Sequence, residues 1–322
     1  MPAETKPVVV AEIVRSGFVE GHHHGSVVAL AADGQTDWSV GDVTDPVLPR
    51  SCNKPLQALG MVRLGLDLPP ELLALACASH SGEPFHLDGV RRILALGDLD
   101  VDALQTPPDY PLDDVAKTAA IRGGDEPSSL AMNCSGKHAA MLLTCVVNGW
   151  DTATYRSPDH PLQQGIAEAF AELTGEPVAV TAVDGCGAPL LSTSLTGLAR
   201  GFRALAVATG GAEHRVAEAI RSYPEYVSGT TRDELKLLTA LPGAIGKAGA
   251  EACYAVALPD GRAYALKIDD GGARARPVVM AAALRRSGVP MEPGVDADAL
   301  DDTGRVPVLG AGEPVGEIRA VF

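Results

Sequence analysis

The stretch "PRSCNKPLQALG", residues 49–60, is where the sequence changes from a strand-like to a helix-like pattern. Before it, residues 7–48 contain short β-branched runs separated by glycines, and Asp33 with Gly34 is typical of a hairpin turn. After it, apolar residues recur at helical spacing between Gly- and Pro-rich loops. We therefore expect the first helix of the chain to begin in this stretch.

Strand patterns return from residue 247 onward. Two apolar runs flank a Pro-Asp-Gly turn at 259–261, which predicts a second hairpin, and we expect a helix near 276–287 and a strand pair near 305–321.

Strands at both ends of the chain and helices in the middle predict an α/β fold with one antiparallel sheet. The sheet is expected to combine residues 7–48 and 247–322, flanked by helices from residues 51–245. Residues 1–322 would then form a single intertwined domain.

Composition restricts the possible partners. The net charge of -15, from 26 Lys and Arg against 41 Asp and Glu, argues against nucleic acid or an anionic membrane surface. No apolar run reaches the roughly 18 to 20 residues of a membrane helix, and Glu12 and Arg15 interrupt the N-terminal one. We expect a cytoplasmic protein that acts on a small molecule. Its six cysteines show no Cys-x-x-Cys spacing, so a disulfide framework is not expected.

Ser51 and Lys54 are three residues apart, so both side chains would project from one face of a helix beginning here. A neutral lysine could accept the serine's proton, and burial or a neighbouring positive charge favours that state. The alternative is that Ser51 caps the helix and Lys54 is solvated, because this spacing is common.

Two further stretches favour a catalytic role for Ser51 and Lys54. In "LACASHSGEP", Ser79 follows an apolar helical run in a polar loop, and in "GAIGKAGAEACYAVAL", Lys247 opens a strand between glycines. The order resembles the Ser-x-x-Lys, Ser-x-Asn and Lys-Thr-Gly elements of penicillin-recognising enzymes. We therefore predict serine-based acyl transfer, with Lys247 supplying positive charge near Lys54.

Two cysteine loops suggest a metal site. "MNCSGKHAAMLL" places Cys134 and Lys137 at a helix start, and "AVDGCGAPLL" places Asp184 and Cys186 in a Gly-rich turn. Two thiolates with a carboxylate nearby suit zinc, and Lys137 could join if the metal displaces its proton. Alternatively, both cysteines are small buried residues in tight turns. The histidines at 22–24 are expected in a surface turn, with His24 facing the site.

The stretches "VEGHHHGSVVAL", "PRSCNKPLQALG", "LACASHSGEPFH", "NCSGKHAAML", "VDGCGAP", "GKAGAEACYAVAL" and "ALKIDDGG" resemble successive motifs of the rhizobial-type, or class 3, L-asparaginases of the asparaginase II protein family. The resemblance covers essentially the whole chain. Two departures are Cys52 and Asn53 after Ser51, where small residues are more typical, and "RDELK" at 232–236, which lacks a cysteine found in some members.

The resemblance implies a fold like that of serine β-lactamases and glutaminases, a homodimer, and hydrolysis of L-asparagine to L-aspartate and ammonia. It implies two serine-lysine pairs, Ser51 with Lys54 and Ser79 with Lys247. It also implies a zinc site made of Cys134, Lys137 and Cys186. The residues expected to contact substrate or support these groups are His24, Arg50, Ser81, Glu83 and Asp184.

The working hypothesis is that Ser51 attacks the side-chain amide, Lys54 accepts its proton, and Ser79 with Lys247 relays a proton to the leaving ammonia. Zinc would hold the two cysteine loops. Rival enzymes are a glutaminase or an amidase or peptidase of the penicillin-recognising type. A rival outside catalysis is a silent amino-acid-binding protein.

Overall fold

The structure is a computed structural model that describes residues 8–322, and these divide into two compact units. Unit 1 combines the described part of Met1–Cys52 with Thr193–Val207 and Lys236–Phe322, and unit 2 combines Asn53–Ser192 with Ala208–Leu235. Each unit is therefore assembled from segments that are distant in the sequence. The single intertwined domain stays a prediction.

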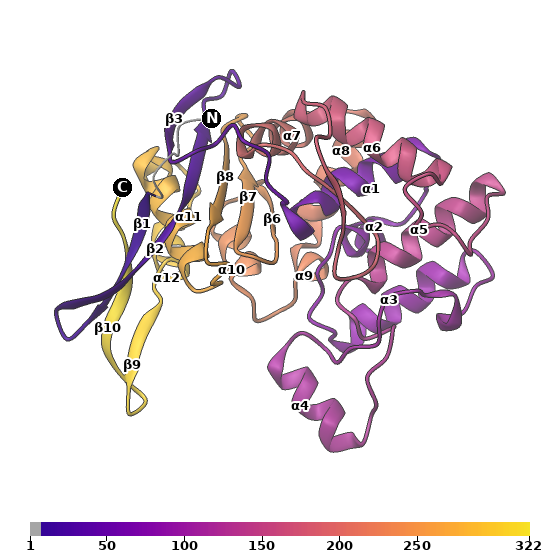
Figure 1. Cartoon of the computed structure of the whole chain (residues 1–322), viewed down its shortest axis with the longest axis horizontal. Coiled ribbons are helices and arrows are strands. Elements are labelled where there is room, and N and C mark those ends of the chain that lie inside the picture. Colours follow the sequence, from indigo (N-terminus) through magenta and orange to yellow (C-terminus); the bar gives the residue numbers. More distant parts are fainter. Residues whose placement is uncertain (1–7) are drawn as a thin grey trace. The chain divides into compact units, whose positions relative to one another are not determined.

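Unit 1 contains, within the described residues, an eight-stranded antiparallel sheet in the order β6-β7-β8-β2-β1-β10-β9, with β3 also paired to β2 (Figure 1). The N-terminal strands β1 and β2 lie between β8 and β10, so strands from both ends of the chain share one sheet, as predicted. The strands are β1 (Val9–Arg15), β2 (Phe18–Leu30), β3 (Thr36–Val40), β6 (Ile245–Ala248), β7 (Cys253–Ala257), β8 (Ala263–Ile268), β9 (Pro307–Gly310) and β10 (Glu313–Ala320).

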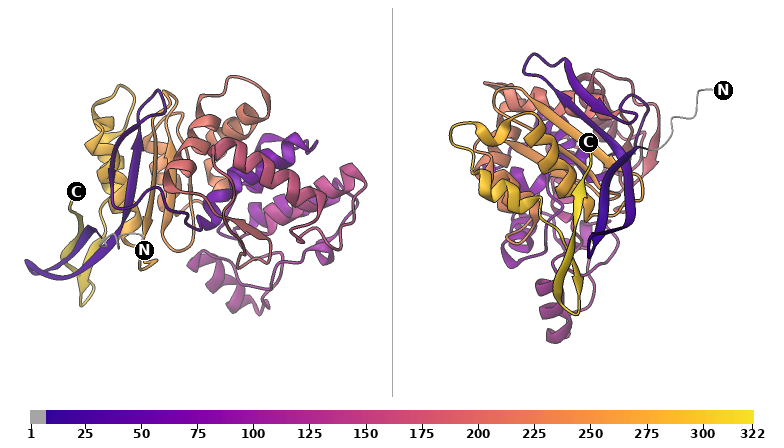
Figure 2. Two further views of the ribbon diagram at one scale, coloured as in Figure 1. Left: turned by 45° about the horizontal axis from the view of Figure 1, so that its top comes forward. Right: turned by 90° about the vertical axis from the view of Figure 1, so that its left-hand side faces the viewer.

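Both predicted hairpins are confirmed. Gly34 (φ 88°) turns the chain between β2 and β3, and Gly261 (φ 96°) does so between β7 and β8. This left-handed backbone region favours glycine because a Cβ atom would be strained there. The predicted C-terminal strand pair is also present, and Figure 2 shows the β9–β10 hairpin (yellow) alongside β1 and β2 (indigo).

The centre of this sheet is covered on both faces. All five residues of β7 are buried, and successive side chains of a strand point to opposite faces. The covering helices are α7 (Leu195–Val207) and α11 (Ala275–Arg286), both of which pack on β7 and β8, and α12 (Ala297–Thr303) packs on α11. Each fully buried Val or Leu here contributes roughly 1.5–3 kcal/mol.

Unit 2 is mainly helical. Its helices are α1 (Lys54–Arg63), α2 (Pro70–Ala76), α3 (Pro84–Ala95), α4 (Asp114–Gly123), α5 (Ser135–Asn148), α6 (Pro161–Thr174), α8 (Gly211–Ser222) and α9 (Pro224–Val227), and α10 (Asp233–Ala240) contains the boundary with unit 1. A short strand pair, β4 (Thr181–Val183) with β5 (Pro189–Leu191), completes it. Helices α1 and α6 approach closely, since a Cβ on Gly60 would lie 2.8 Å from the Ile166 Cα.

Several of these elements differ from the sequence expectation. Helix α4 was not predicted, because none of its residues is buried and the apolar periodicity that marks a helix is therefore weak. The β4–β5 pair lies inside a region predicted to be helical; each strand has only three residues, too few for a period-two pattern. Among residues 8–322, no helix combines the length and apolarity that crossing a bilayer requires.

Candidate active site

The segment that carries Ser51 is a 3-10 turn, Arg50–Asn53, which runs directly into α1. In unit 1 this turn is attached to β6, because the thiol of Cys52 donates to the Lys247 carbonyl over 3.0 Å. A Cβ on Gly249 would lie 2.6 Å from the Pro49 carbonyl oxygen, so only glycine permits this approach. The structure therefore brings the strand of Lys247 to the turn of Ser51.

Lys54 and Ser79 meet inside unit 2. Lys54 is 1% exposed, and its Nζ donates to the Ser79 Oγ over 2.9 Å and to the Ala78 carbonyl. Sequence reasoning had assigned these two residues to different serine-lysine pairs. The observed hydrogen bond links the pairs directly, with the lysine as donor.

The Ser79 segment is extended and held from both sides. Ser79 and Ser81 donate backbone N–H groups to the carbonyls of Val227 and Ser228, over 3.1 and 2.7 Å, and His80 donates to the Asn133 carbonyl over 3.0 Å. Such pairing fixes the direction of the Ser79 side chain, because alternate residues of an extended segment point to opposite sides.

His80 is a buried neighbour of this pair that sequence reasoning left without a role. Ser135 uses its hydroxyl proton on the Leu130 carbonyl over 2.8 Å, so its oxygen accepts from the His80 Nε2 over 2.8 Å. Burial, His86 and the Lys54 charge hold the pKa of His80 well below its usual value. The ring is therefore neutral, and its Nδ1 is a buried acceptor with no hydrogen-bond partner among residues 8–322.

His86 stacks on His80, with ring centroids 5.2 Å apart, and its hydrogen bonds define its tautomer. Its Nδ1 accepts from the Glu83 backbone N–H over 3.2 Å, so Nε2 donates to the Glu225 carbonyl over 3.0 Å. Burial lowers the pKa of His86 to about 4. Both rings therefore stay neutral at pH 7.

Acid should destabilise the protein through His86. The unfolded chain takes up this proton below about pH 6.5 and the folded protein only near pH 4, so stability falls as pH drops through this window, by at most about 3 kcal/mol. Chemical denaturation at pH 7 and pH 4.5 should show a smaller pH-dependent loss in His86→Gln than in the intact protein. An equal loss in both would contradict the assignment.

Glu83 and Ser81 are engaged in holding a loop. The Glu83 carboxylate accepts from the Thr230 N–H over 2.9 Å and from its hydroxyl over 2.7 Å. A Cβ on Gly229 would lie 2.0 Å from the Ser81 Oγ, so the loop lies directly on this serine. These hydrogen bonds anchor the loop of Thr230 to Glu83. A substrate that contacts Glu83 would have to share the same carboxylate.

The histidines at 22–24 lie within β2, so the surface-turn interpretation was wrong. His23 is buried and its Nδ1 pairs with the Asp270 carboxylate, which follows β8. The two flanking rings point to the opposite face of the strand from His23. His24 is half-buried and its carbonyl accepts from the Asp269 N–H over 2.8 Å.

Arg50 lies 3.6 Å from the Glu251 carboxylate.

The cysteine loops meet within unit 2. Cys134 precedes α5, Lys137 lies in its first turn, and Cys186 lies in the β4–β5 turn. All three are buried, and the Lys137 Nζ is 3.3 Å from the Cys186 Sγ. The Asp184 carboxylate lies 3.7 Å from the same sulfur, as its place in the turn predicted.

The charge state of this cluster follows from its contacts. A hydrogen bond from Cys134 and the charge of Lys137 lower the pKa of Cys186, whereas the same hydrogen bond and burial raise the pKa of Cys134. Burial opposes the charge of Lys137, but the sulfur groups and Asp184 outweigh it and raise its pKa. These pKa directions favour a thiolate on Cys186 beside an ammonium group on Lys137.

His138 extends the cluster inward and was left open by the sequence. The His138 Nδ1 and the Tyr155 hydroxyl share a hydrogen bond of 2.6 Å, and the same hydroxyl accepts from the Gln105 N–H over 3.3 Å. Burial lowers the pKa of His138 and Cys186 opposes this effect. Its position directly after Lys137 was the only sequence signal for it.

The donor chemistry of this cluster fits zinc. Two sulfur atoms and one amine nitrogen converge in a buried site, and thiolates are preferred zinc ligands. No group of three or more His, Cys, Asp or Glu side chains in the described chain is arranged to hold a metal. A metal here would therefore depend on Lys137.

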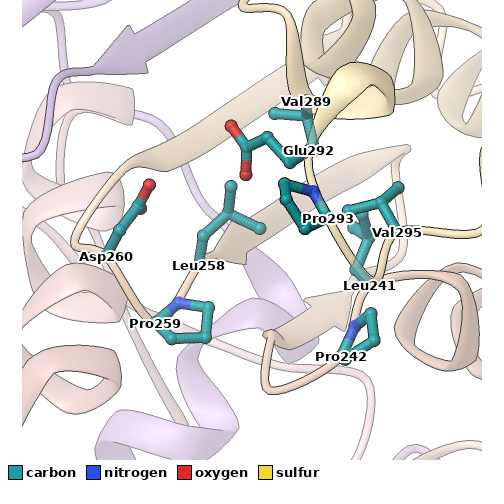
Figure 3. A pocket seen from close by; sticks show the side chains of 9 residues that line it. All are labelled: Leu241, Pro242, Leu258, Pro259, Asp260, Val289, Glu292, Pro293 and Val295. Carbon is teal, nitrogen blue, oxygen red and sulfur yellow. The ribbon is translucent and has the colours of Figure 1, made fainter.

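A separate cavity of about 190 Å3 lies in unit 1 (Figure 3). Its lining is apolar apart from two carboxylates, and the lining residues are Leu241, Pro242, Leu258, Pro259, Asp260, Val289, Glu292, Pro293 and Val295. None of the predicted site residues is among them.

Among solved structures, the chain is similar to a β-lactamase from Mycobacterium bovis, at 17% identity over 81% of this chain and 94% of that one, with a TM-score of 0.44. It is similar to Mglu in its glutamate form at 14% identity, over 88% of this chain and 65% of that one, with a TM-score of 0.46. It is also similar to EstCE1, a hydrolase with promiscuous acyltransferase activity, at 13% identity over 82% and 93%, with a TM-score of 0.41.

No curated protein sequence matches the chain. The family model described as L-asparaginase II matches residues 11–320, which is nearly the whole sequence. The chain therefore belongs to the L-asparaginase II family.

Proposed function

We propose that this amidohydrolase converts L-asparagine to L-aspartate and ammonia, with Ser51 as nucleophile and Lys54 as its proton acceptor. The observation that carries the proposal is the buried hydrogen bond of 2.9 Å from the Lys54 Nζ to the Ser79 Oγ. Lys54 begins the helix that follows the Ser51 turn, and its amine contacts the second serine, Ser79. This position suits a group that accepts a proton from Ser51 and passes it to Ser79. Family membership supports the amide as the bond that is broken.

In the first half of the reaction, the Ser51 Oγ attacks the side-chain amide carbon while its proton passes to neutral Lys54. Lys54 then donates to Ser79, and the Ser79 hydroxyl gives its proton to the amide nitrogen, so that the C–N bond breaks and ammonia leaves. Backbone N–H groups at the start of α1 would stabilise the oxyanion.

In the second half, water attacks the Ser51 ester and its proton passes to Lys54. The ester bond breaks, L-aspartate leaves, and the serine recovers its proton from Lys54. Lys247, attached to the Ser51 turn through Cys52, would add positive charge that favours neutral Lys54. A homodimer, which the resemblance implies, stays a prediction.

An ammonia-release assay of the purified protein tests the proposed substrate. We expect the kcat/KM for L-asparagine to exceed that for L-glutamine by about tenfold or more, because one additional methylene group is worth roughly 1–3 kcal/mol in a fitted site. Faster release from glutamine would favour a glutaminase, hydrolysis of a β-lactam would favour a penicillin-recognising enzyme, and no release from any amide would favour a binding protein.

We also propose that Cys134, Lys137 and Cys186 hold a zinc ion. When bound, zinc would cross-link the start of α5 to the β4–β5 turn and hold both loops in position. The lowered pKa of Cys186 and its distance of 3.3 Å from the Lys137 Nζ support this proposal. The proposed ligands are different residues from both serine-lysine pairs, which favours a supporting role.

Purified intact protein should contain roughly one zinc ion per chain, as a dedicated site would give. Cys134→Ser with Cys186→Ser should contain less than about a tenth of that amount, because lysine alone is a poor ligand. Elemental analysis after dialysis measures this, with the buried Cys145→Ser as control. An unchanged zinc content in the double variant would remove the proposed site.

A further inference from the structure

Beyond the proposed reaction, the structure points to the residue that recognises the substrate as an amino acid. We propose that Arg232 binds the α-carboxylate of the substrate. The inference rests on the proposed function, because it concerns the same site. Sequence reasoning noticed this segment only for the cysteine that it lacks.

Arg232 is carried by residues 228–232, which lie over the Ser79 segment. Thr230 is bonded to Glu83 and Thr231 donates to the Asp113 carboxylate over 2.9 Å. Gly229 (φ 144°) permits the close approach to Ser81. The loop is therefore held on residues 79–83 at several points, and the position of Arg232 is determined by this attachment.

The guanidinium group reaches the candidate catalytic serine. Its Nη1 donates to the Ser79 carbonyl over 3.3 Å, and its Nη2 lies 2.8 Å from the Glu234 carboxylate. The Glu234 side chain is 1% exposed, whereas that of Arg232 is 20% exposed. One edge of the guanidinium is thus held by buried partners, while the group keeps access to solvent.

This geometry leaves N–H donors of Arg232 that can bind an anion. A guanidinium has five N–H donors in a rigid plane that matches a carboxylate, and the two contacts described above do not use all of them. Within the described part of unit 2, two cations donate to Ser79: Lys54 to its side chain and Arg232 to its backbone. Lys54 is fully buried and is needed for proton transfer, so Arg232 is the cation suited to a substrate anion.

The substrate supplies a matching anion. In L-asparagine the α-carboxylate is joined to the amide group through two carbon atoms, so it must bind close to the groups that act on the amide. A charge-assisted hydrogen bond to this carboxylate would select α-amino acids over simple amides.

The test compares two substrates in three proteins. L-Asparagine and β-alaninamide differ only by the α-carboxylate, and ammonia release from each is measured with the intact protein, Arg232→Gln and Arg232→Lys. We expect Arg232→Gln to lower the kcat/KM for L-asparagine about 10- to 100-fold, the effect of a charged hydrogen bond, and to change that for β-alaninamide less than about threefold. Arg232→Lys should recover part of the loss, mainly through KM.

Inhibition provides a second measurement that does not require turnover of a poor substrate. Arg232→Gln should raise the inhibition constant of L-aspartate about tenfold or more and leave that of β-alanine, which lacks the α-carboxylate, within about threefold. Arg63→Gln is the matched control, since Arg63 is also ion-paired in unit 2 but lies nine residues beyond Lys54 along α1, about 13 Å away.

Equal losses on L-asparagine and β-alaninamide would mean that Arg232 acts only through the Ser79 backbone and would overturn the inference. An unchanged kcat/KM for L-asparagine in Arg232→Gln would also overturn it. If the intact protein released no ammonia from either amide, the proposed function would fail and this inference with it. If the intact protein is active and only the Arg232 results differ from expectation, the inference alone fails.

Discussion

Ser51→Ala is expected to slow ammonia release from L-asparagine by about 10,000-fold or more, the usual effect of removing a catalytic nucleophile. Without the Ser51 hydroxyl no acyl-enzyme can form, and Lys54 has no proton to accept. The protein should remain folded, because Ser51 is only partly buried and lies in a turn attached to β6 through its neighbour Cys52. Single-turnover kinetics with thermal melting would measure both properties.

The exposed Ser39→Ala in β3 is the control for this variant and should retain full activity. Substantial activity in Ser51→Ala, within about tenfold of the intact protein, would exclude Ser51 as the nucleophile and make Ser79 the first alternative. Ser79→Ala, by contrast, should lose about 100- to 10,000-fold, as expected for a residue that relays protons.

Lys54→Met should lower kcat by about 100- to 10,000-fold, because the unbranched side chain still fills most of the space but no longer transfers protons. The change removes a buried amine that donates to Ser79 and to the Ala78 carbonyl. An unsatisfied buried carbonyl costs about 1–3 kcal/mol, and the loss of a buried polar amine offsets part of that cost. Stability measured by denaturant titration should therefore change far less than activity.

Lys267→Met is a matched control, since this half-buried lysine also donates to two backbone carbonyls, those of Glu251 and Ile268, but contacts no candidate serine. It should keep the intact kcat. A Lys54→Met protein as active as this control would show that another group accepts the serine's proton.

Some elements of the fold were accessible from local sequence. The turns at Gly34 and Gly261, the helix at α11 and the C-terminal strand pair were all predicted where the structure has them. Helix α4 was not, because it contributes no buried residue. The strand position of the histidines at 22–24 was also missed, since a polar triplet resembles a turn when its pairing partner β1 is not considered.

In the candidate site, too, local motifs were predicted and contacts between distant residues were not. Sequence motifs selected Ser51, Lys54, Ser79 and Lys247; spacing paired Ser51 with Lys54, and the family resemblance paired Ser79 with Lys247. The structure joins Lys54 to Ser79, 25 residues away, and attaches the Ser51 turn to the strand of Lys247. It also adds His80 and Arg232, which no short motif distinguishes from ordinary polar residues.

The sequence by itself determined that strands at both ends of the chain flank a mainly helical middle, and it determined the residue types available for amide hydrolysis. These properties depend on periodicity and turn chemistry over a few residues. Only the tertiary structure decided which groups meet: Lys54 with Ser79, Cys186 with Lys137, and Arg232 with the Ser79 carbonyl. Such contacts join residues 25 to 153 positions apart, so they are set by how the helices and loops pack rather than by any local pattern.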